Sequence, residues 1–240
     1  METHRVFVAW EPRPDRVGAS AKQLLAAMEW LRTVPELEGD WAAVAPRTRA
    51  SLPCSSAATA ARCLAAGGYP IATPPRSTES EYYKQDFYLG SARKWQAKIT
   101  IVCGVRRVMY GIQAPNRFDV TVRAALSPLA VRQILVGLVS VFRPTWGFGA
   151  SERFPAGPSP ENGSPTVGWL TYLSSWFGAP PPLAAPALIS PVPNFGTIIQ
   201  AFPEAFDPGD DAQRSTIRAL EKTLRASGTL RPFATSAAPR

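Results

Sequence analysis

Three carboxylates close together, Glu79, Glu81 and Asp86, are the side chains that most directly suggest catalysis. A pair of carboxylates can divide the roles of general acid and general base when their environments differ. A charged loop exposed to solvent explains the same spacing, and no catalytic motif accompanies these residues. We therefore interpret the segment as a solvated loop.

The side chains that bind transition metals are few. The three cysteines, Cys54, Cys63 and Cys103, form no C-x-x-C pair, and His4 is the only histidine. An odd number of isolated cysteines argues against both a disulfide framework and a zinc site. We expect free, partly buried thiols in a reducing compartment, a surface position for His4, and neither a metal nor a cofactor.

The motifs that mark common enzyme classes are also missing from the sequence. It contains no G-x-x-x-x-G-K-[ST], no G-x-S-x-G and no H-E-x-x-H, and Gly147-Phe148-Gly149 lacks the third glycine of a dinucleotide loop. Arg106 and Arg107 are suited to clamping a phosphate, although the wet face or edge of a sheet explains them equally. An enzyme is therefore the least favoured class of function.

Composition and charge restrict the partners. The 240 residues carry a net charge of +8 and are 45% apolar, which is normal for a folded domain. The basic residues are scattered, so the concentrated stripe typical of a nucleic-acid interface is missing, although acidic partners are favoured. No span of about 20 apolar residues and no leader-like segment occurs. We expect a cytoplasmic protein that binds neither nucleic acid nor membrane.

Two segments alternate with a period of two and are predicted to be strands. Ala97, Ile99, Ile101, Cys103 and Val105 share one face of the first, and 117–124 alternates in the same way, with Lys98, Thr100 and Asp119 among the residues on the wet faces. Further strands are expected over 4–10, 39–46 and 196–202.

Helices are expected from Ser20 to before Pro35, over 55–66 with a left-handed cap at Gly67-Gly68, over 128–142, and from Asp207 to Gly228. The Pro-rich segments 69–80 and 178–193 are predicted to be extended connections.

These elements predict an α+β fold in which helices pack on a mostly antiparallel sheet. No linker divides the chain, so we expect a single domain over residues 1–240, with a frayed tail from 232 to 240.

An aromatic stretch from Arg143 to Trp176 is the most distinctive part of the sequence. It contains Trp146-Gly147-Phe148-Gly149 and then Val167-Gly168-Trp169-Leu170-Thr171-Tyr172-Leu173-Ser174, separated by a loop rich in Pro, Gly, Ser and Asn. Two sheet-edge strands that pack their aromatic side chains into a core explain the stretch. A recognition surface is the alternative, because Trp, Tyr and Arg are enriched at binding hot spots.

The order of these segments resembles the bacterial immunity proteins of the family numbered fifty-two. The resemblance rests on Trp146-Gly147, on the run from Val167 to Ser174, on the Pro-rich connector, on Gly196-Thr197-Ile198-Ile199 and on the closing amphipathic helix, and it is best over 97–228. It implies a single-domain α+β antidote that binds a cognate toxin encoded next door. Such toxins often carry a restriction-endonuclease-like nuclease domain and are delivered by contact-dependent or type VI secretion systems.

The hypothesis for the toxin-binding residues combines this resemblance with the hot-spot argument: Trp146, Phe148, Trp169, Tyr172, Arg106 and Arg107. A charge of +8 departs from the acidic surface with which nuclease inhibitors often imitate DNA. Basic patches could instead pair with the carboxylates of a metal-dependent nuclease site, or the protein could act away from that site. A basic module that binds a small molecule or nucleic acid without catalysis remains the alternative function.

Overall fold

The computed structural model describes residues 3–11, 17–44, 51–70, 80–91, 94–103, 116–151 and 165–231. Within them the chain forms four α-helices, two short 3-10 helices and eleven strands. The helices are α1 (Val17–Leu31), α2 (Ala57–Ala66), α3 (Pro128–Phe142) and α4 (Asp211–Ala226), with η1 (Pro35–Leu37) and η2 (Ser175–Phe177). The strands are β1 (His4–Trp10), β2 (Trp41–Val44), β3 (Ser51–Pro53), β4 (Gly68–Pro70), β5 (Ser80–Gly90), β6 (Trp95–Cys103), β7 (Asn116–Val122), β8 (Trp146–Ser151), β9 (Leu170–Ser174), β10 (Leu188–Val192) and β11 (Gly196–Gln200).

All eleven strands belong to one antiparallel sheet. Their order is β10-β11-β9-β8-β1-β7-β6-β5-β2-β3, and β4 pairs with β5 outside this path. The first strand of the chain thus lies in the middle of the sheet, between β7 and β8. One continuous cluster of buried side chains follows the sheet. The predicted α+β fold, a mostly antiparallel sheet with helices packed on it in a single domain, is confirmed.

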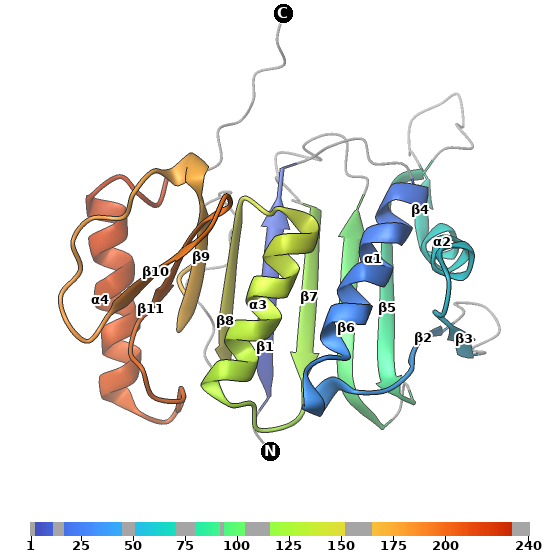
Figure 1. Ribbon diagram of the computed structural model, residues 1–240, viewed down its shortest axis with the longest axis horizontal. Coiled ribbons are helices and arrows are strands. Elements are labelled where there is room, and N and C mark those ends of the chain that lie inside the picture. The colour runs from blue at the N-terminus through green and yellow to red at the C-terminus, as the bar shows by residue number, and fades with distance from the viewer. Residues whose placement is uncertain are drawn as a thin grey trace, which may run out of the picture.

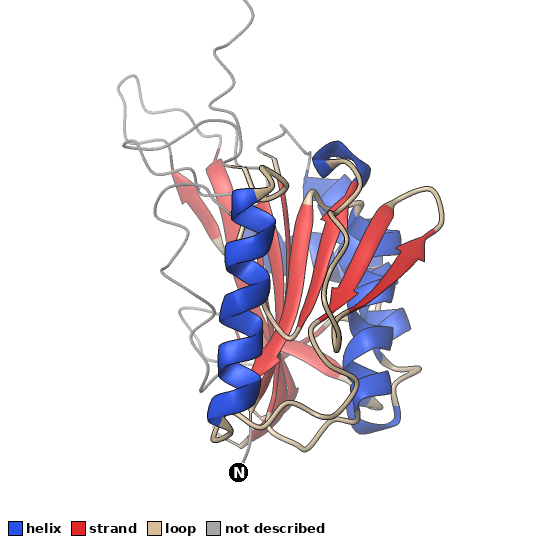
Figure 2. Cartoon of the chain, turned by 90° about the vertical axis from the view of Figure 1, so that its left-hand side faces the viewer, coloured by secondary structure: helices blue, strands red, loops and turns tan. Residues whose placement is uncertain are grey.

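The helices cover the two faces of the sheet unequally. Figure 1 shows α1 and α3 side by side in front of the strands, with α2 beside α1. Figure 2 shows α4 on the opposite side of the sheet, at the end formed by β9, β11 and β10. We call this opposite side the back face. No helix of the described residues lies over the back of β5, β6 and β7.

Helix α3 is the helix that the sequence predicted most closely. The Ser127 hydroxyl accepts a hydrogen bond from the Ala130 N–H at 3.1 Å, and Pro128 occupies the first turn. Arg143, at φ 46°, ends the helix in the left-handed region. The helix packs on β1 and β8, where Gly147 and Gly149 face it without side chains. This absence of side chains lets α3 approach the sheet closely.

Helix α2 begins as expected but ends differently. The Ser56 hydroxyl accepts from the Thr59 N–H, and the Thr59 hydroxyl accepts from the Ser56 N–H, which forms a capping box. Gly67 has φ −92°, so the predicted left-handed cap at this residue is wrong. Position 67 requires glycine for lack of space, because a Cβ there would lie 2.1 Å from the carbonyl oxygen of Lys84 on β5.

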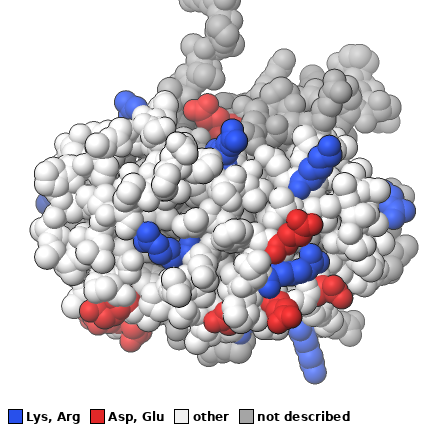
Figure 3. All heavy atoms as spheres, in the orientation of Figure 1, with Lys and Arg blue, Asp and Glu red and all other residues white. Residues whose placement is uncertain are grey.

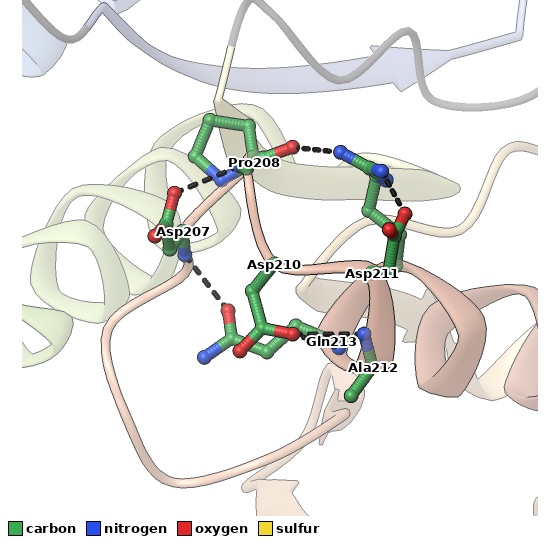
Figure 4. A network of polar contacts seen from close by, with 8 residues as sticks. Asp207, Pro208, Asp210, Asp211, Ala212 and Gln213 are labelled. Atoms are coloured by element: carbon green, nitrogen blue, oxygen red, sulfur yellow. Dashed lines mark hydrogen bonds and ion pairs between the residues drawn. The ribbon is translucent and has the colours of Figure 1, made fainter.

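The last helix starts later than the sequence suggested. Residues Asp207 and Pro208 form a loop, and Asp210 caps α4 by accepting from the N–H groups of Ala212 and Gln213 (Figure 4). Within the loop, the Gln213 side chain accepts from the Asp207 N–H, and the Arg214 guanidinium contacts both Pro208 and Asp211. The carboxylates of Asp210 and Asp211 therefore order the first turn of α4, where the positive end of the helix dipole favours a negative charge.

Two expected connections contain strands instead. Glu81 and Asp86, which were assigned to a solvated loop, lie on β5, where Phe87 and Leu89 face the helices and are buried. The Pro-rich segment 178–193 contains β10, which pairs with β11. The aromatic strands β8 and β9 were expected at a sheet edge but lie inside the sheet, because β1 and β11 flank them.

Replacement of Gly147 by alanine tests the close approach of α3 to the sheet. The added Cβ would lie 2.7 Å from the Phe7 carbonyl oxygen and 2.8 Å from a Val8 methyl group. We expect Gly147→Ala to lower the free energy of unfolding by about 1–3 kcal/mol, the range for overpacked cores. Urea denaturation followed by fluorescence measures this change. Gly18→Ala is the matched control, since a Cβ at Gly18 meets no atom within 4 Å. Equal stability of the two variants would contradict the prediction.

Candidate functional site

The four aromatic residues of the hypothesis lie in the core. Trp146, Trp169 and Tyr172 are 1% exposed and Phe148 is 5% exposed. Their polar atoms are satisfied inside the protein, at 2.9 Å in each case: Trp146 Nε1 donates to Thr166 O, Trp169 Nε1 to Phe202 O, and the Tyr172 hydroxyl to Phe195 O. Burial raises the pKa of Tyr172 to about 12. The core alternative fits this placement, and these rings do not frame an accessible surface in this structure.

The remaining residues of the hypothesis lie elsewhere. Arg106 and Arg107, like Glu79, fall outside the described residues. Their contact with a toxin stays a prediction. His4, expected at the surface, is 5% exposed on the central strand β1. Its parity on the strand places it on the helix-covered face, together with Val6, Val8 and Trp10.

The back face of the sheet carries the polar residues that the alternating pattern predicted. Register places Asp86, Thr100 and Asp119 opposite one another on β5, β6 and β7. The rows on either side add Lys84 and Arg117, and Tyr88, Lys98, Thr121 and Arg5. We call this surface the polar sheet face, and it consists of Arg5, Lys84, Asp86, Tyr88, Lys98, Thr100, Arg117, Asp119 and Thr121.

An ion pair marks the boundary between the polar sheet face and the aromatic core. The Arg5 guanidinium binds the Asp119 carboxylate through Nε, at 2.9 and 3.1 Å, and through Nη2, at 2.5 Å. Its charged carbon also lies 5.4 Å from the centre of the Phe7 ring and 5.7 Å from that of Phe148. A guanidinium that stacks on rings and forks onto a carboxylate has a fixed orientation. This arrangement fixes the inner border of the face.

A second carboxylate is held on the neighbouring strands. Asp86 accepts a hydrogen bond from the Thr100 hydroxyl at 2.6 Å, and the Tyr88 hydroxyl lies 3.5 Å from its other oxygen. Burial, together with the nearby charge and hydrogen bond of Asp86, raises the pKa of Tyr88. Both described carboxylates of the polar sheet face are therefore engaged by neighbours.

Cationic side chains outnumber the carboxylates on this face, with four Lys or Arg and two Asp. Lys84 is exposed and Lys98 is half-buried. At the end of the same strands, the Arg123 guanidinium stacks on Trp95 at 3.6 Å, and Lys98 Nζ lies 5.9 Å from that ring. The arrangement is suited to binding an acidic surface by charge and hydrogen bonds.

Groups that could carry out covalent or metal chemistry are not assembled in the described part of the chain. None of its three cysteines forms a disulfide, as predicted, but all three are fully buried and not partly buried as expected. Burial raises the pKa of Cys54 to about 12 and raises that of Cys63 as well, which suppresses the reactive thiolate. No cluster of three His, Cys, Asp or Glu residues suited to a metal occurs among the described residues. None of the described helices has the length and apolar character needed to span a membrane.

The opposite face of the molecule differs in character. Figure 3 shows the side covered by α1 and α3, where most of the visible surface belongs to uncharged residues. Charged side chains of both signs lie close together at the lower right of this view and again near its top.

A family model described as Immunity protein 52 matches residues 8–233, nearly the whole chain. The chain belongs to the Immunity protein 52 family. The match includes the N-terminal part that the sequence resemblance did not reach. It also spans every strand of the polar sheet face, apart from the first residues of β1.

Comparison with solved structures adds a likeness of fold. A T6SS protein of Pseudomonas aeruginosa matches with a TM-score of 0.54 and 14% sequence identity. The match covers 100% of this chain and 78% of that chain. A search of curated protein sequences finds no match.

Sequence reasoning missed part of the polar sheet face in this Immunity protein 52 chain. Lys98, Thr100, Arg117 and Asp119 were placed correctly on wet faces by alternation; Thr121 lies on the same face but is buried, at 7% exposed. Arg5 was missed, because β1 reads as a continuous apolar strand. Lys84 and Tyr88 were missed with β5; the alternation of Tyr83, Gln85, Phe87 and Leu89 with Lys84, Asp86 and Tyr88 was the signal that would have revealed them.

Truncation of a buried tryptophan distinguishes a core role from an interface role. We expect Trp169→Ala to lower the free energy of unfolding by about 3–5 kcal/mol, because it leaves a large cavity and removes the bond to Phe202. Trp176→Ala is the control, since Trp176 is 39% exposed, and we expect a loss of about 1 kcal/mol or less. Thermal and urea denaturation measure both. An unchanged melting temperature for Trp169→Ala would contradict a core role.

Proposed function

We propose that this chain is a cytoplasmic antidote that binds a cognate secreted toxin and neutralises it stoichiometrically, without catalysis. The observation that carries the proposal is the Immunity protein 52 match over residues 8–233. The toxin is encoded next to the antidote and is delivered by a type VI or contact-dependent secretion system. The likeness of fold to a T6SS protein of Pseudomonas aeruginosa supports the first of these two routes.

The proposed toxin is a nuclease, and the proposed contact surface is the polar sheet face. Lys84 and Lys98 form no ion pair with a described residue, so their charges are available to a partner, whereas Arg5 is committed to Asp119. Metal-dependent nuclease sites are built from carboxylates. Cations on a sheet, a rigid element, can cover such a site or bind an acidic surface beside it. This mode suits a chain of net charge +8, whose sign is opposite to that of DNA.

Neutralisation is tested first in bacteria. We expect expression of the neighbouring gene to stop growth and co-expression of this chain to restore it. The two proteins should co-purify at a fixed ratio, because a stoichiometric inhibitor must remain bound. A harmless neighbour, or rescue without a physical complex, would contradict the proposal.

Charge reversal on the polar sheet face tests the contact surface. We expect Lys98→Glu to weaken toxin binding at least tenfold, about 1.4 kcal/mol, because it places a like charge opposite an acidic surface. Calorimetric titration measures the affinity, and the wild-type affinity should fall as salt is added. Lys22→Glu is the matched control, since Lys22 is exposed on α1, across the sheet. Equal affinities of the two variants for the toxin would show that the toxin does not contact the polar sheet face.

The alternative function is a basic module that binds a small molecule or nucleic acid through the same cations. It predicts binding to a generic duplex that weakens steeply with salt, because each neutralised phosphate releases counterions. The antidote proposal predicts no such binding at physiological salt. One salt series with duplex DNA therefore separates the two functions.

A further inference from the structure

One end of the sheet is built from a stretch without charge. Residues 162–203 contain no Lys, Arg, Asp, Glu or His, although the whole chain has a net charge of +8. Strands β9, β10 and β11 all come from this stretch, and β10 is the last strand of the sheet at this end. The charge of the protein is therefore carried by the rest of the molecule.

Strand β10 exposes apolar side chains on both faces of the sheet. Leu188 is 50% exposed and Ile189 is 44% exposed, and they are two of the five large exposed hydrophobic residues of the described chain. Successive residues of a strand point to opposite faces, so one side chain lies on each face. On the back face, register connects Ile189 through Ile199, Thr171 and Phe148 to the row that contains Asp119.

The backbone of β10 is available for pairing on its outer side. Proline is accommodated in an edge strand when its nitrogen faces away from the ladder, which places the nitrogen of Pro191 on the open edge. Ile189, two residues earlier, then directs its N–H and C=O outward as well. The other end strand, β3, has only three residues, ends in Pro53 and follows Arg47 and Arg49 in the sequence. Short length, proline and nearby charge usually protect an edge strand from pairing with another chain. Strand β10 is longer than β3 and has no charged residue near it in the sequence, so it is less protected.

We infer that β10 pairs with β10 of a second copy of this chain, so that the sheet continues across a two-fold dimer. Two copies, each with a charge of +8, repel one another over most of their surfaces. The uncharged end of the sheet is the place where they approach at least electrostatic cost. An edge strand is also self-complementary in the antiparallel sense that a two-fold axis requires. This oligomeric state goes beyond the proposed neutralisation of a toxin.

The geometry of the edge sets the register of the dimer. With the axis at Ile189, its N–H donates to the carbonyl of the same residue in the second copy, and the reciprocal bond forms. The ladder stops on one side at Pro191, which has no N–H. It stops on the other side at Ala187, whose N–H already donates to Ala184 O at 3.2 Å. Leu188 and Ile189 then pack against their counterparts, each on its own face of the joined sheet.

Sedimentation of the full chain over a wide concentration range tests the inference. We expect wild type to sediment with twice the monomer mass at high concentration and Ile189→Lys to stay monomeric, with unchanged circular dichroism and the melting temperature of dilute, monomeric wild type. Leu129→Lys is the matched control, because Leu129 is 63% exposed on α3, on the helix-covered side, and should leave the dimer intact. A wild type that is monomeric at every concentration would overturn the inference.

Hydrogen exchange keeps the inference testable if Ile189→Lys does not fold. In wild type, the Ile189 amide should be protected from exchange at high concentration and should lose that protection on dilution, whereas core amides of β1 should not change. Exchange of the Ile189 amide that is independent of concentration would overturn the pairing.

The toxin assay separates this inference from the proposed function. We expect Ile189→Lys to rescue growth as wild type does, which leaves the dimer edge distinct from the toxin-binding surface. If wild type is monomeric and Ile189→Lys loses toxin binding, the edge belongs to the toxin, and the second-copy inference is wrong while the antidote function stands. If neither protein rescues growth yet wild type dimerises, the proposed function fails alone.

Discussion

The structure depends on burying strand β1 on both of its faces. This strand joins the two halves of the sheet, because it pairs with β7 on one side and β8 on the other. Its front side chains, Val8 and Trp10 among them, need α3, and Trp10 stacks on Phe142 of that helix at 4.9 Å. Its back side chain Phe7 needs the rings of Trp146 and Phe148, 5.1 and 5.2 Å away. The buried aromatic stretch is a consequence of this central position.

That requirement also explains why the polar sheet face begins where it does. The aromatic cluster ends at Arg5, whose guanidinium stacks on two rings and binds Asp119. On the aromatic side, the chain segment after Pro165 lies over the sheet, tied to β8 by the bond from Trp146 to Thr166 and to α4 by the bond from Arg225 to Pro165. On the other side, no described helix covers β5, β6 and β7. One row of the sheet therefore passes from carboxylates through aromatics to aliphatic residues.

The sequence correctly predicted those strands and helices whose pattern of apolar and polar residues matches their burial in the structure. The alternation in β6 and β7 and the Ser127-Pro128 start of α3 were sufficient, because those strands have one buried face and that helix has its own cap. The strand β5 was missed because its outward residues are charged and resemble a loop when its partners are unknown. The strand β10 was missed because proline argues against a central strand but not against an edge.

The candidate site was harder to predict than the fold, because the side chains that suggested it occur in two kinds of environment. Tryptophan and tyrosine are favoured both in cores and at interfaces, so Trp169 and Tyr172 are compatible with either until tertiary contacts are known. The bonds that satisfy their polar atoms, to Phe202 and Phe195, join residues 33 and 23 positions apart. No local pattern reveals such contacts. The wet face of a sheet is different, because alternation within one strand already separates Lys98 and Asp119 from the core.

On the polar sheet face, the charged residues that are already paired within the protein and the lysines that form no ion pair have different roles in the proposed recognition. Removing an existing ion pair from water costs less than removing an isolated charge, because the pair already satisfies part of each ion's hydrogen-bonding capacity. The pair of Arg5 and Asp119 can thus be covered by a partner at moderate cost while it keeps the surface in one arrangement. In the proposed contact, specificity depends on Lys84 and Lys98, which form no ion pair with a described residue and bind well only where the partner supplies an acceptor. On that proposal, a rigid sheet that fixes most of its polar groups and keeps two lysines without a carboxylate partner among the described residues discriminates among acidic partners by their geometry as well as by their charge.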